Sequence, residues 1–102
     1  MAKNVLFDDI GFALATEASG DLAEFDTGDF TQLVVQATAT SNMSFILQVS
    51  PDGTLWLDET VLGIAPNGLA TASSDVAFAH ARLRFVVTGS AAVASVRVLG
   101  RL

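Results

Sequence analysis

Few side chains in this sequence could act as an acid, a base or a nucleophile. His80 is the single histidine, cysteine is absent, and no serine partner stands at a recognisable catalytic spacing from that histidine. The glycine-rich loops that bind nucleotides and the serine-centred turn of hydrolases have no match. A lone histidine is typical of a surface or loop residue, so the sequence favours a protein that binds other proteins over an enzyme.

Three aspartates offer a pattern that could hold a metal ion. Asp26 and Asp29 flank a Thr-Gly pair, and Asp52 lies in a separate turn. Carboxylate oxygens are ligands that calcium prefers, but aspartates beside glycine are also typical of solvated turns. We expect turns here and no cofactor. Without cysteine, neither a disulfide nor a thiolate zinc site can form.

Sugar binding would need exposed aromatic faces, and the sequence has few aromatic residues to offer. Tyrosine is absent and Trp56 is the single tryptophan. We interpret Trp56 as a core anchor beside a turn, whereas an exposed Trp56 would favour a carbohydrate or receptor site. Phe45 and Phe85 fall on predicted inner faces. The other phenylalanines fall at strand ends, where core filling is the expected role: Phe7, Phe12, Phe25, Phe30 and Phe78.

Composition and charge narrow the class further. Of 102 residues, 51% are apolar and 16% are charged, so the chain can build one core and is not disordered. Seven of the eleven acids lie in residues 1–29, whereas residues 30–102 balance four acids with four arginines. A basic face for nucleic acid is therefore missing. The acids are expected to keep the domain soluble; a head-to-tail contact with the arginine-bearing region is the alternative.

The N-terminus has neither the apolar run nor the cleavage site of a signal peptide, because Asp8 and Asp9 interrupt it. No stretch approaches the length of a membrane span. We therefore expect a soluble protein that is not secreted by a signal peptide.

Alternation of apolar and polar side chains predicts strands from residue 30 onward. Residues 31–38 and 43–50 each show this period of two, which is typical of a strand with one buried face. The predicted buried faces hold Leu33, Val35, Ala37, Phe45, Leu47 and Val49.

The sharpest local signal is the turn Ser50-Pro51-Asp52-Gly53. Proline presets the backbone, aspartate suits the next position, and glycine can take the left-handed conformation that closes a hairpin. Residues 54–58 are therefore predicted to return antiparallel to residues 43–50. Residues 59–75, with the turn Pro66-Asn67-Gly68, are expected to form a long connection between sheets.

Residues 81–88 and 91–99 are predicted to form a second hairpin across Thr88-Gly89-Ser90-Ala91. The inner face of the first strand would hold Leu83, Phe85 and Val87, and its outer face Arg82 and Arg84. In the second strand Ala94, Val96 and Val98 share one face.

Residues 1–29 carry weaker signals. Residues 4–7 predict a short strand, and residues 12–16 and 21–25 predict a hairpin, with a short helix over residues 14–18 as the alternative. The whole pattern predicts an all-β chain: a single antiparallel β-sandwich of jelly-roll or Greek-key type, with seven to eight strands. We expect one domain, with residues 1–29 as an acidic arm or edge strands and residues 30–102 as the sandwich core.

Four runs of residues resemble a group of small β-sandwich structural proteins of tailed bacteriophages: 30–38, 45–56, 81–89 and 94–98. In that group a strand ending in an S-x-D-G-T-x-W hairpin precedes an A-R-x-L-R-like strand and a G-x-A-x-V-x-V terminal strand. Here the middle pattern reads Ala81-Arg82-Leu83-Arg84, one residue shorter, and the tyrosine common in that strand is missing. The resemblance covers about residues 30–99.

The resemblance implies a non-enzymatic virion protein that is made in the host cytoplasm. We expect a capsid decoration (cement) subunit, a small homo-oligomer with a trimer favoured. Its partner would be the major capsid protein or another virion protein, not nucleic acid or a membrane. A tail or fibre module that binds a receptor or carbohydrate is the alternative.

Two sets of residues follow from these expectations. The candidate subunit or capsid contacts are Phe7, Asp8, Asp9, Phe12, Arg82 and Arg84. Cross-strand pairing with acids is the alternative role for the two arginines. The candidate core and turn residues are Leu33, Val35, Phe45, Leu47, Pro51, Asp52, Gly53, Trp56, Leu83 and Phe85.

Overall fold

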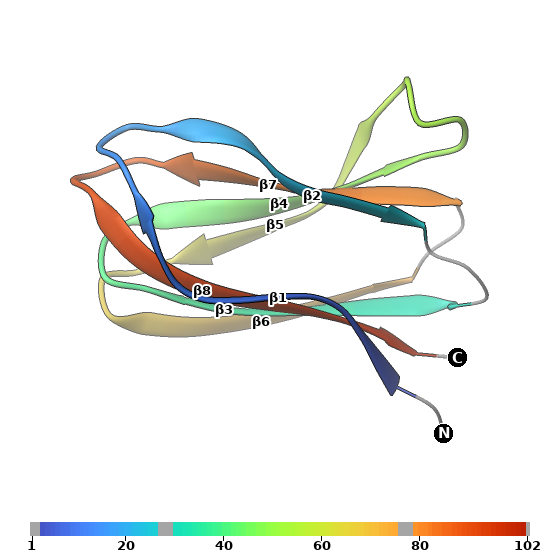
Figure 1. Cartoon of the computed structure of the whole chain (residues 1–102), viewed down its shortest axis with the longest axis horizontal. Helices are drawn as coiled ribbons and strands as arrows, with labels where there is room; N and C mark the ends of the chain where they lie inside the picture. Colours follow the sequence, from blue (N-terminus) through green and yellow to red (C-terminus); the bar gives the residue numbers. More distant parts are fainter. Residues whose placement is uncertain (1–2, 27–29, 76–78, 102) are drawn as a thin grey trace.

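A computed structural model describes residues 3–26, 30–75 and 79–101. The regular structure in these ranges is β-strand, arranged as two layers that face each other (Figure 1). The strands are β1 (Lys3–Leu14), β2 (Ser19–Asp26), β3 (Gln32–Ala39), β4 (Met43–Ser50), β5 (Leu57–Ile64), β6 (Gly68–Asp75), β7 (His80–Val87) and β8 (Ala92–Arg101). The predicted all-β sandwich is confirmed. Among the described residues there is no helix long and apolar enough to cross a membrane.

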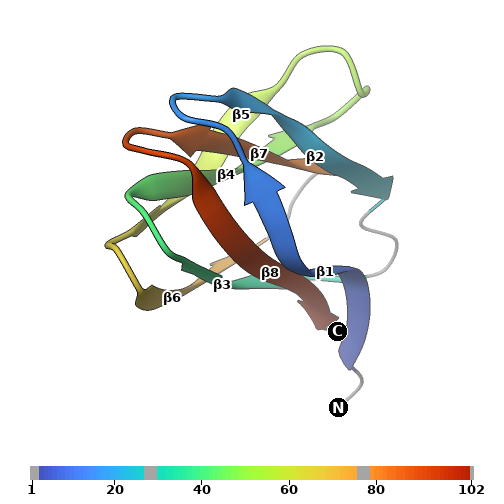
Figure 2. The ribbon, with the colours of Figure 1, turned by 60° about the vertical axis from the view of Figure 1, so that its left-hand side comes forward.

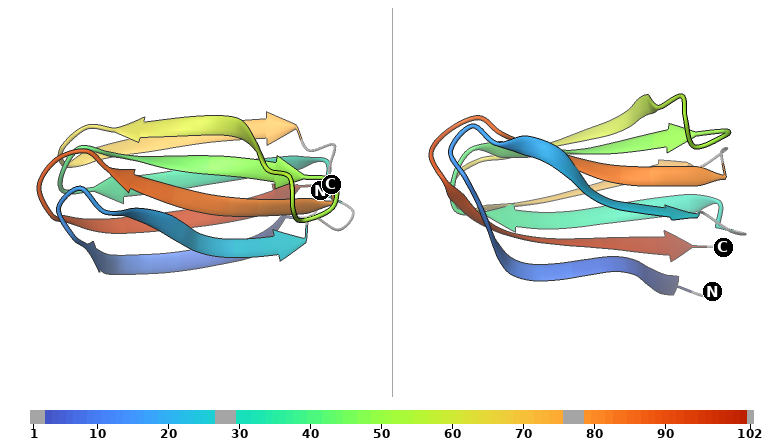
Figure 3. Two further views of the ribbon diagram at one scale, coloured as in Figure 1. Left: turned by 90° about the horizontal axis from the view of Figure 1, so that it is seen from above. Right: turned by 45° about the horizontal axis from the view of Figure 1, so that its top comes forward.

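The order of the strands is that of a jelly roll. One sheet runs β1-β8-β3-β6, the other runs β2-β7-β4-β5, and every pairing is antiparallel. Consecutive strands lie in different sheets except β4 and β5, so the chain wraps around the sandwich as two Greek keys do. Figures 2 and 3 show the chain passing from layer to layer at the end where β1 joins β2 and β7 joins β8.

Two predicted hairpins are wrong because their strands belong to different sheets. The turn after β7 leads to β8 in the opposite layer, where Val87 and Ala92 both turn inward and are 2% exposed. The two strands on either side of this turn therefore pack against each other across the core instead of pairing as a hairpin. The turn between β1 and β2 also crosses the sandwich, and the short helix considered there is wrong as well, since Glu17 takes a positive φ of 55°.

The hairpin of β4 and β5 is confirmed, but with a longer loop than predicted. Residues 51–55 form bends, and the second strand begins at Leu57. Gly53 has the predicted left-handed backbone, with a φ of 81°. Residues 59–75 are not a long connection: they hold most of β5 and all of β6. These two edge strands bury little of their surface, so their many small and polar side chains do not show the alternating pattern that predicts a strand.

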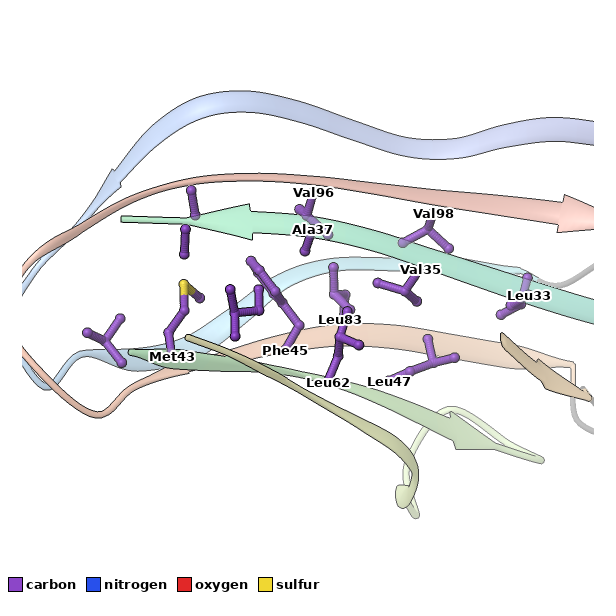
Figure 4. Close-up of a cluster of buried hydrophobic side chains, with 14 of the residues drawn as sticks. Leu33, Val35, Ala37, Met43, Phe45, Leu47, Leu62, Leu83, Val96 and Val98 are labelled. Carbon is purple, nitrogen blue, oxygen red and sulfur yellow. The ribbon is translucent and has the colours of Figure 1, made fainter. Parts of the chain in front are cut away.

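The core lies between the two sheets and is built mainly from alternate residues of the inner strands, with Leu62 and Ile64 of β5 added (Figure 4). The predicted core residues Leu33, Val35, Phe45, Leu47 and Leu83 are each at most 2% exposed. Burial of each large side chain contributes roughly 1.5–3 kcal/mol of transfer free energy. Phe85 is partly buried against this cluster, as predicted for its face. The two sheets are thus joined by apolar packing that leaves their outer faces free for other roles.

Candidate interaction surface

The loop between β4 and β5 is closed by its own side chains. The backbone N–H of Gly53 donates to Ser50 Oγ (2.8 Å), and those of Thr54 and Leu55 donate to Asp52 Oδ1 (2.9 and 3.1 Å). These two bonds to the carboxylate hold the pKa of Asp52 well below its usual range. Ser50 is fully buried beneath the loop, whereas Pro51 and Asp52 are exposed. The predicted turn residues therefore hold a compact loop against one end of its sheet.

Trp56 follows this loop and lies over an arginine of β7. The Arg82 guanidinium carbon is 4.3 Å from the centre of the Trp56 ring, a cation–π contact. Arg82 Nε donates to Gln48 Oε1 (2.6 Å), and Gln48 Nε2 donates to Asp58 Oδ1 (2.6 Å). Gln48 is only 8% exposed although its position faces away from the core. One face of the tryptophan and one hydrogen bond thus fix the arginine, and Asp58 in turn fixes the Gln48 side chain that accepts this bond.

The interpretation of Trp56 as a core anchor is wrong. Its side chain is half-buried and does not belong to the core cluster. The inner positions of β4 are already filled by Phe45, Leu47 and Val49, and the longer loop brings Trp56 to the outer side of the sheet. Trp56 therefore shields polar groups instead of filling the sandwich.

Asp21 on β2 ties both predicted contact arginines to the neighbouring strand. Its carboxylate lies 2.7 Å from Arg84 Nε and 3.8 Å from Arg82 Nη1. At the other end of the same strand pair, Asp26 lies 3.2 Å from His80 Nδ1. The acidic strand β2 thus matches the basic side chains of β7, which is the cross-strand pairing considered for Arg82 and Arg84. Whether these arginines also contact a partner stays a prediction.

We name this outer region the Arg82 surface, after its central residue. It comprises Asp21, Gln48, Trp56, Asp58, Arg82 and Arg84. Three apolar side chains lie on the adjoining loop and edge strand: Leu55, Leu57 and Val61 are 71%, 56% and 60% exposed. A fixed polar centre beside exposed apolar side chains is suited to binding another protein.

The other predicted contact residues lie on the opposite sheet, so the six do not form one surface. Asp8 of β1 pairs with Arg97 of β8, with 3.1 Å between Oδ2 and Nη2. Phe12 is half-buried, and its ring meets Phe45 edge-on at 6.4 Å. Phe12 is therefore a core residue, which was the expected role for a phenylalanine at a strand end. Phe7 and Asp9 belong to β1, but their side chains are outside the described part of the structure.

The possible calcium ligands have other partners where they are described. Asp26 lies beside His80, Asp52 closes its own loop, and Asp29 is outside the described residues. In the described part of the chain, no group of three or more histidines or carboxylates is placed to hold a metal ion.

A shallow groove of about 230 Å³ marks the outer face of the other sheet. Its walls include Gln36, Leu69, Ser95 and the Asp8–Arg97 ion pair. The groove is open, and its lining holds no nucleophile or base set for catalysis.

Gln48, Asp58 and Asp21 are site residues that the sequence reasoning did not find. Gln48 stands on the polar side of its predicted strand, so the alternation of the sequence indicated that it faces away from the core. The sequence did not indicate which strands pair: Gln48 lies opposite both Arg82 and Asp58, and Asp21 lies opposite Arg84. Only the register of four strands brings these side chains together.

Comparison with known proteins finds the same fold in several solved structures, two of which are phage-derived. No family model and no curated sequence matches the chain. The PBSX exported protein XepA superposes with a TM-score of 0.80 at 13% identity, over 97% of this chain and 36% of that one. The SPBc2 prophage-derived protein YomS gives 0.64 at 16% identity, over 97% and 92%. A pilus protein of Bacillus endospore appendages gives 0.61 at 8% identity, over 98% and 89%.

These likenesses establish a shared fold. The chain spans about a third of the length of XepA and nearly all of YomS. The expected resemblance to phage β-sandwich proteins is thus matched in the fold by two phage-derived structures.

Proposed function

We propose that this protein is a non-enzymatic structural subunit of a tailed-phage virion, and within that class a capsid decoration subunit. The observation that carries the proposal is the jelly roll, shared over 97% of the chain with two phage-derived proteins. The motifs of β4, β7 and β8 that resemble phage sandwich proteins support the same class. The protein would be made in the host cytoplasm and would reside in the virion.

The mechanism of such a subunit is physical. The Arg82 surface is held by hydrogen bonds and ion pairs before any partner arrives, so little conformational entropy is lost on binding. We propose that it binds the outer capsid surface, with Val61 adding apolar area. A small homo-oligomer, with a trimer as the expected number, would repeat each modest contact over the shell.

The acidic N-terminal segment is a second proposed contact. Its strands β1 and β2 form the edge of each sheet on the same side of the sandwich, where Asp8 and Asp9 are placed. Deleting β1 would also remove Phe12 from the core, so Asp9→Asn is the cleaner test of a charged contact. Weaker capsid binding by this variant supports the contact, and unchanged binding removes it.

Co-sedimentation with capsids of the parent phage tests the main proposal. Val61→Glu places a charge beside the Arg82 surface, and Val93→Glu places the same charge on the opposite face, where Val93 is 49% exposed. We expect the first variant to bind roughly tenfold more weakly, about 1.4 kcal/mol, and the second to bind as the wild type does. A wild-type protein that does not sediment with capsids would refute the decoration role.

Trp56 favours a second candidate, a tail or fibre module that binds a carbohydrate or receptor. Its half-buried indole lies on an outer face, where an aromatic ring can stack on a sugar. A glycan array with wild type and Trp56→Ala separates the two roles. A glycan signal that Trp56→Ala abolishes supports the module, and the absence of any signal counts against it.

A further inference from the structure

The four edge strands of the sandwich differ in how they are protected from pairing with another chain. Exposed edges are usually blunted by bulges, charges or proline. β1, β2 and β5 each contain at least one register shift against their neighbour, and each carries two or more acidic residues. β6 pairs with β3 over all eight residues without a shift. Its one charged residue is Asp75, at its last position.

The side chains of β6 are also suited to a close approach. Ala70 and Ala72 face inward, and Thr71 and Ser73 lie on the exposed outer side. Leu69, on that same side, is 74% exposed, the highest value among the large apolar residues of the described chain. Residues 69–73 of β6 carry no charged side chain that an added strand would meet. The carboxylate of Glu59 on β5 accepts a hydrogen bond from Ser74 Oγ (2.9 Å), beyond the middle of the strand.

We propose that β6 pairs antiparallel with β6 of a second copy of this chain, about a twofold axis at Thr71. The β1-β8-β3-β6 sheet would then continue across two protomers. Residues that lie opposite each other in an antiparallel pair point to the same face of the sheet. A twofold axis perpendicular to the sheet must therefore place one residue opposite its own copy, because a slip by one residue would pair an outer side chain with an inner one. Thr71 is close to the middle of the strand, so this register pairs nearly its whole length.

The register at Thr71 is favourable for each class of side chain. Thr71 lies opposite the partner's Thr71, a cross-strand pair that suits a sheet surface. Ala70 lies opposite the partner's Ala72 on the inner side. Asp75 lies opposite the partner's Asn67, which keeps the two carboxylates roughly 26 Å apart. An axis at Ala72 would instead place Leu69 opposite the partner's Asp75.

This contact predicts how many copies of the chain the oligomer contains. A twofold contact joins two chains, or joins two trimers into a hexamer, and in either case the number of copies is even. The pairing is a property of the isolated protein, so its test does not depend on whether a capsid is the partner.

A single cysteine tests the register directly, because the chain has none of its own. Residues opposite each other in antiparallel strands have Cα atoms about 4.5–5.5 Å apart, within disulfide range. Thr71→Cys should therefore cross-link to a covalent dimer under mild oxidation. In Ser73→Cys the two cysteines would be roughly 13 Å apart along the strands and should stay unlinked. Cross-linking of Thr71→Cys no faster than that of Ser73→Cys would overturn the proposal.

A charge at the axis provides a second, non-covalent test. Thr71→Lys places two ammonium groups face to face, whereas the control Thr38→Lys puts the same charge on the exposed side of the next strand, β3. Light scattering should show the wild-type mass halved by the first variant at concentrations where the control keeps its mass. An unchanged mass for Thr71→Lys, or a wild type that is monomeric at every concentration, would overturn the pairing.

Discussion

The two outer faces of the sandwich belong to the same jelly roll but differ in how far their polar side chains are shielded from water. On the β2-β7-β4-β5 face, the loop before β5 and Trp56 cover part of the sheet, so Gln48 and Ser50 are buried although they point away from the core. On the β1-β8-β3-β6 face, Leu69 and Val93 are exposed and the Asp8–Arg97 pair is open to solvent. Similar polar side chains should therefore matter much more on the first face than on the second.

Replacing one arginine on each face by alanine should give the largest difference in the free energy of unfolding. We expect Arg82→Ala to lower the free energy of unfolding by about 2–3 kcal/mol, because buried Gln48 loses a charged partner. Arg97→Ala should change it by less than about 0.5 kcal/mol, since its ion pair is exposed. Urea unfolding followed by circular dichroism measures both values. Equal losses would show that the cover over Arg82 has no energetic effect.

Removing the cover itself should have a smaller effect. Trp56→Ala should cost about 1–2 kcal/mol, because the cation–π contact is lost and water reaches Gln48. The neighbouring exposed residue provides the control: Leu57→Ala should cost less than about 0.5 kcal/mol. Thermal unfolding of both variants is the measurement. If Leu57→Ala is the more damaging change, Trp56 is not the shield.

The glycine that closes the loop comes next. Gly53→Ala should cost roughly 1 kcal/mol, because an L side chain is strained at a φ of 81°. Gly63→Ala, on β5 with open space around the added carbon, should be neutral or slightly stabilising. Denaturant unfolding compares the two. A neutral Gly53→Ala would mean that the loop can close in another conformation.

Acid should act on the covered face through Asp52, with the smallest effect of all. The lowered pKa means that the folded loop favours the ionised carboxylate. This contribution is present above the ordinary value of 3.8 and is lost as the pH falls below it toward the folded pKa. Trp56 fluorescence should report loosening of the loop in acid, and Asp52→Asn should remove that step. A carboxyl carbon shift of Asp52 that titrates at its ordinary value would contradict this assignment.

Local sequence was a good guide to strands and faces. The alternation around Leu33, Phe45 and Leu83 predicted which side chains fill the core, since period-two burial is written along each strand. The turn at Gly53 was also predictable, because its chemistry is local. The edge strands β5 and β6 were not, since Asp58, Ser73 and their neighbours have one sparsely buried face and little apolar pattern.

Pairing partners and the candidate site depend on contacts that no local pattern contains. A short turn after Val87 looks the same whether the chain folds back beside itself or crosses to the opposite sheet. Here the chain crosses to the opposite sheet because Val87 and Ala92 are both buried in the core between the sheets. Trp56 was misplaced for the same reason, because its environment is set by Arg82, 26 positions along the chain. The sequence thus predicted the inner strands well, but it predicted the edge strands β5 and β6 and the pairing of the strands poorly.

The alternation of consecutive strands between the two sheets has a consequence for how the chain is made. Only β4 and β5 can pair as soon as both have left the ribosome, because every other strand of the described chain waits for a partner that is distant in sequence. β1 remains unpaired until residues 92–101 have been synthesised, since its neighbour is β8. Strand edges of this domain therefore stay exposed until its last strand has been synthesised, and its folding is expected to be slow.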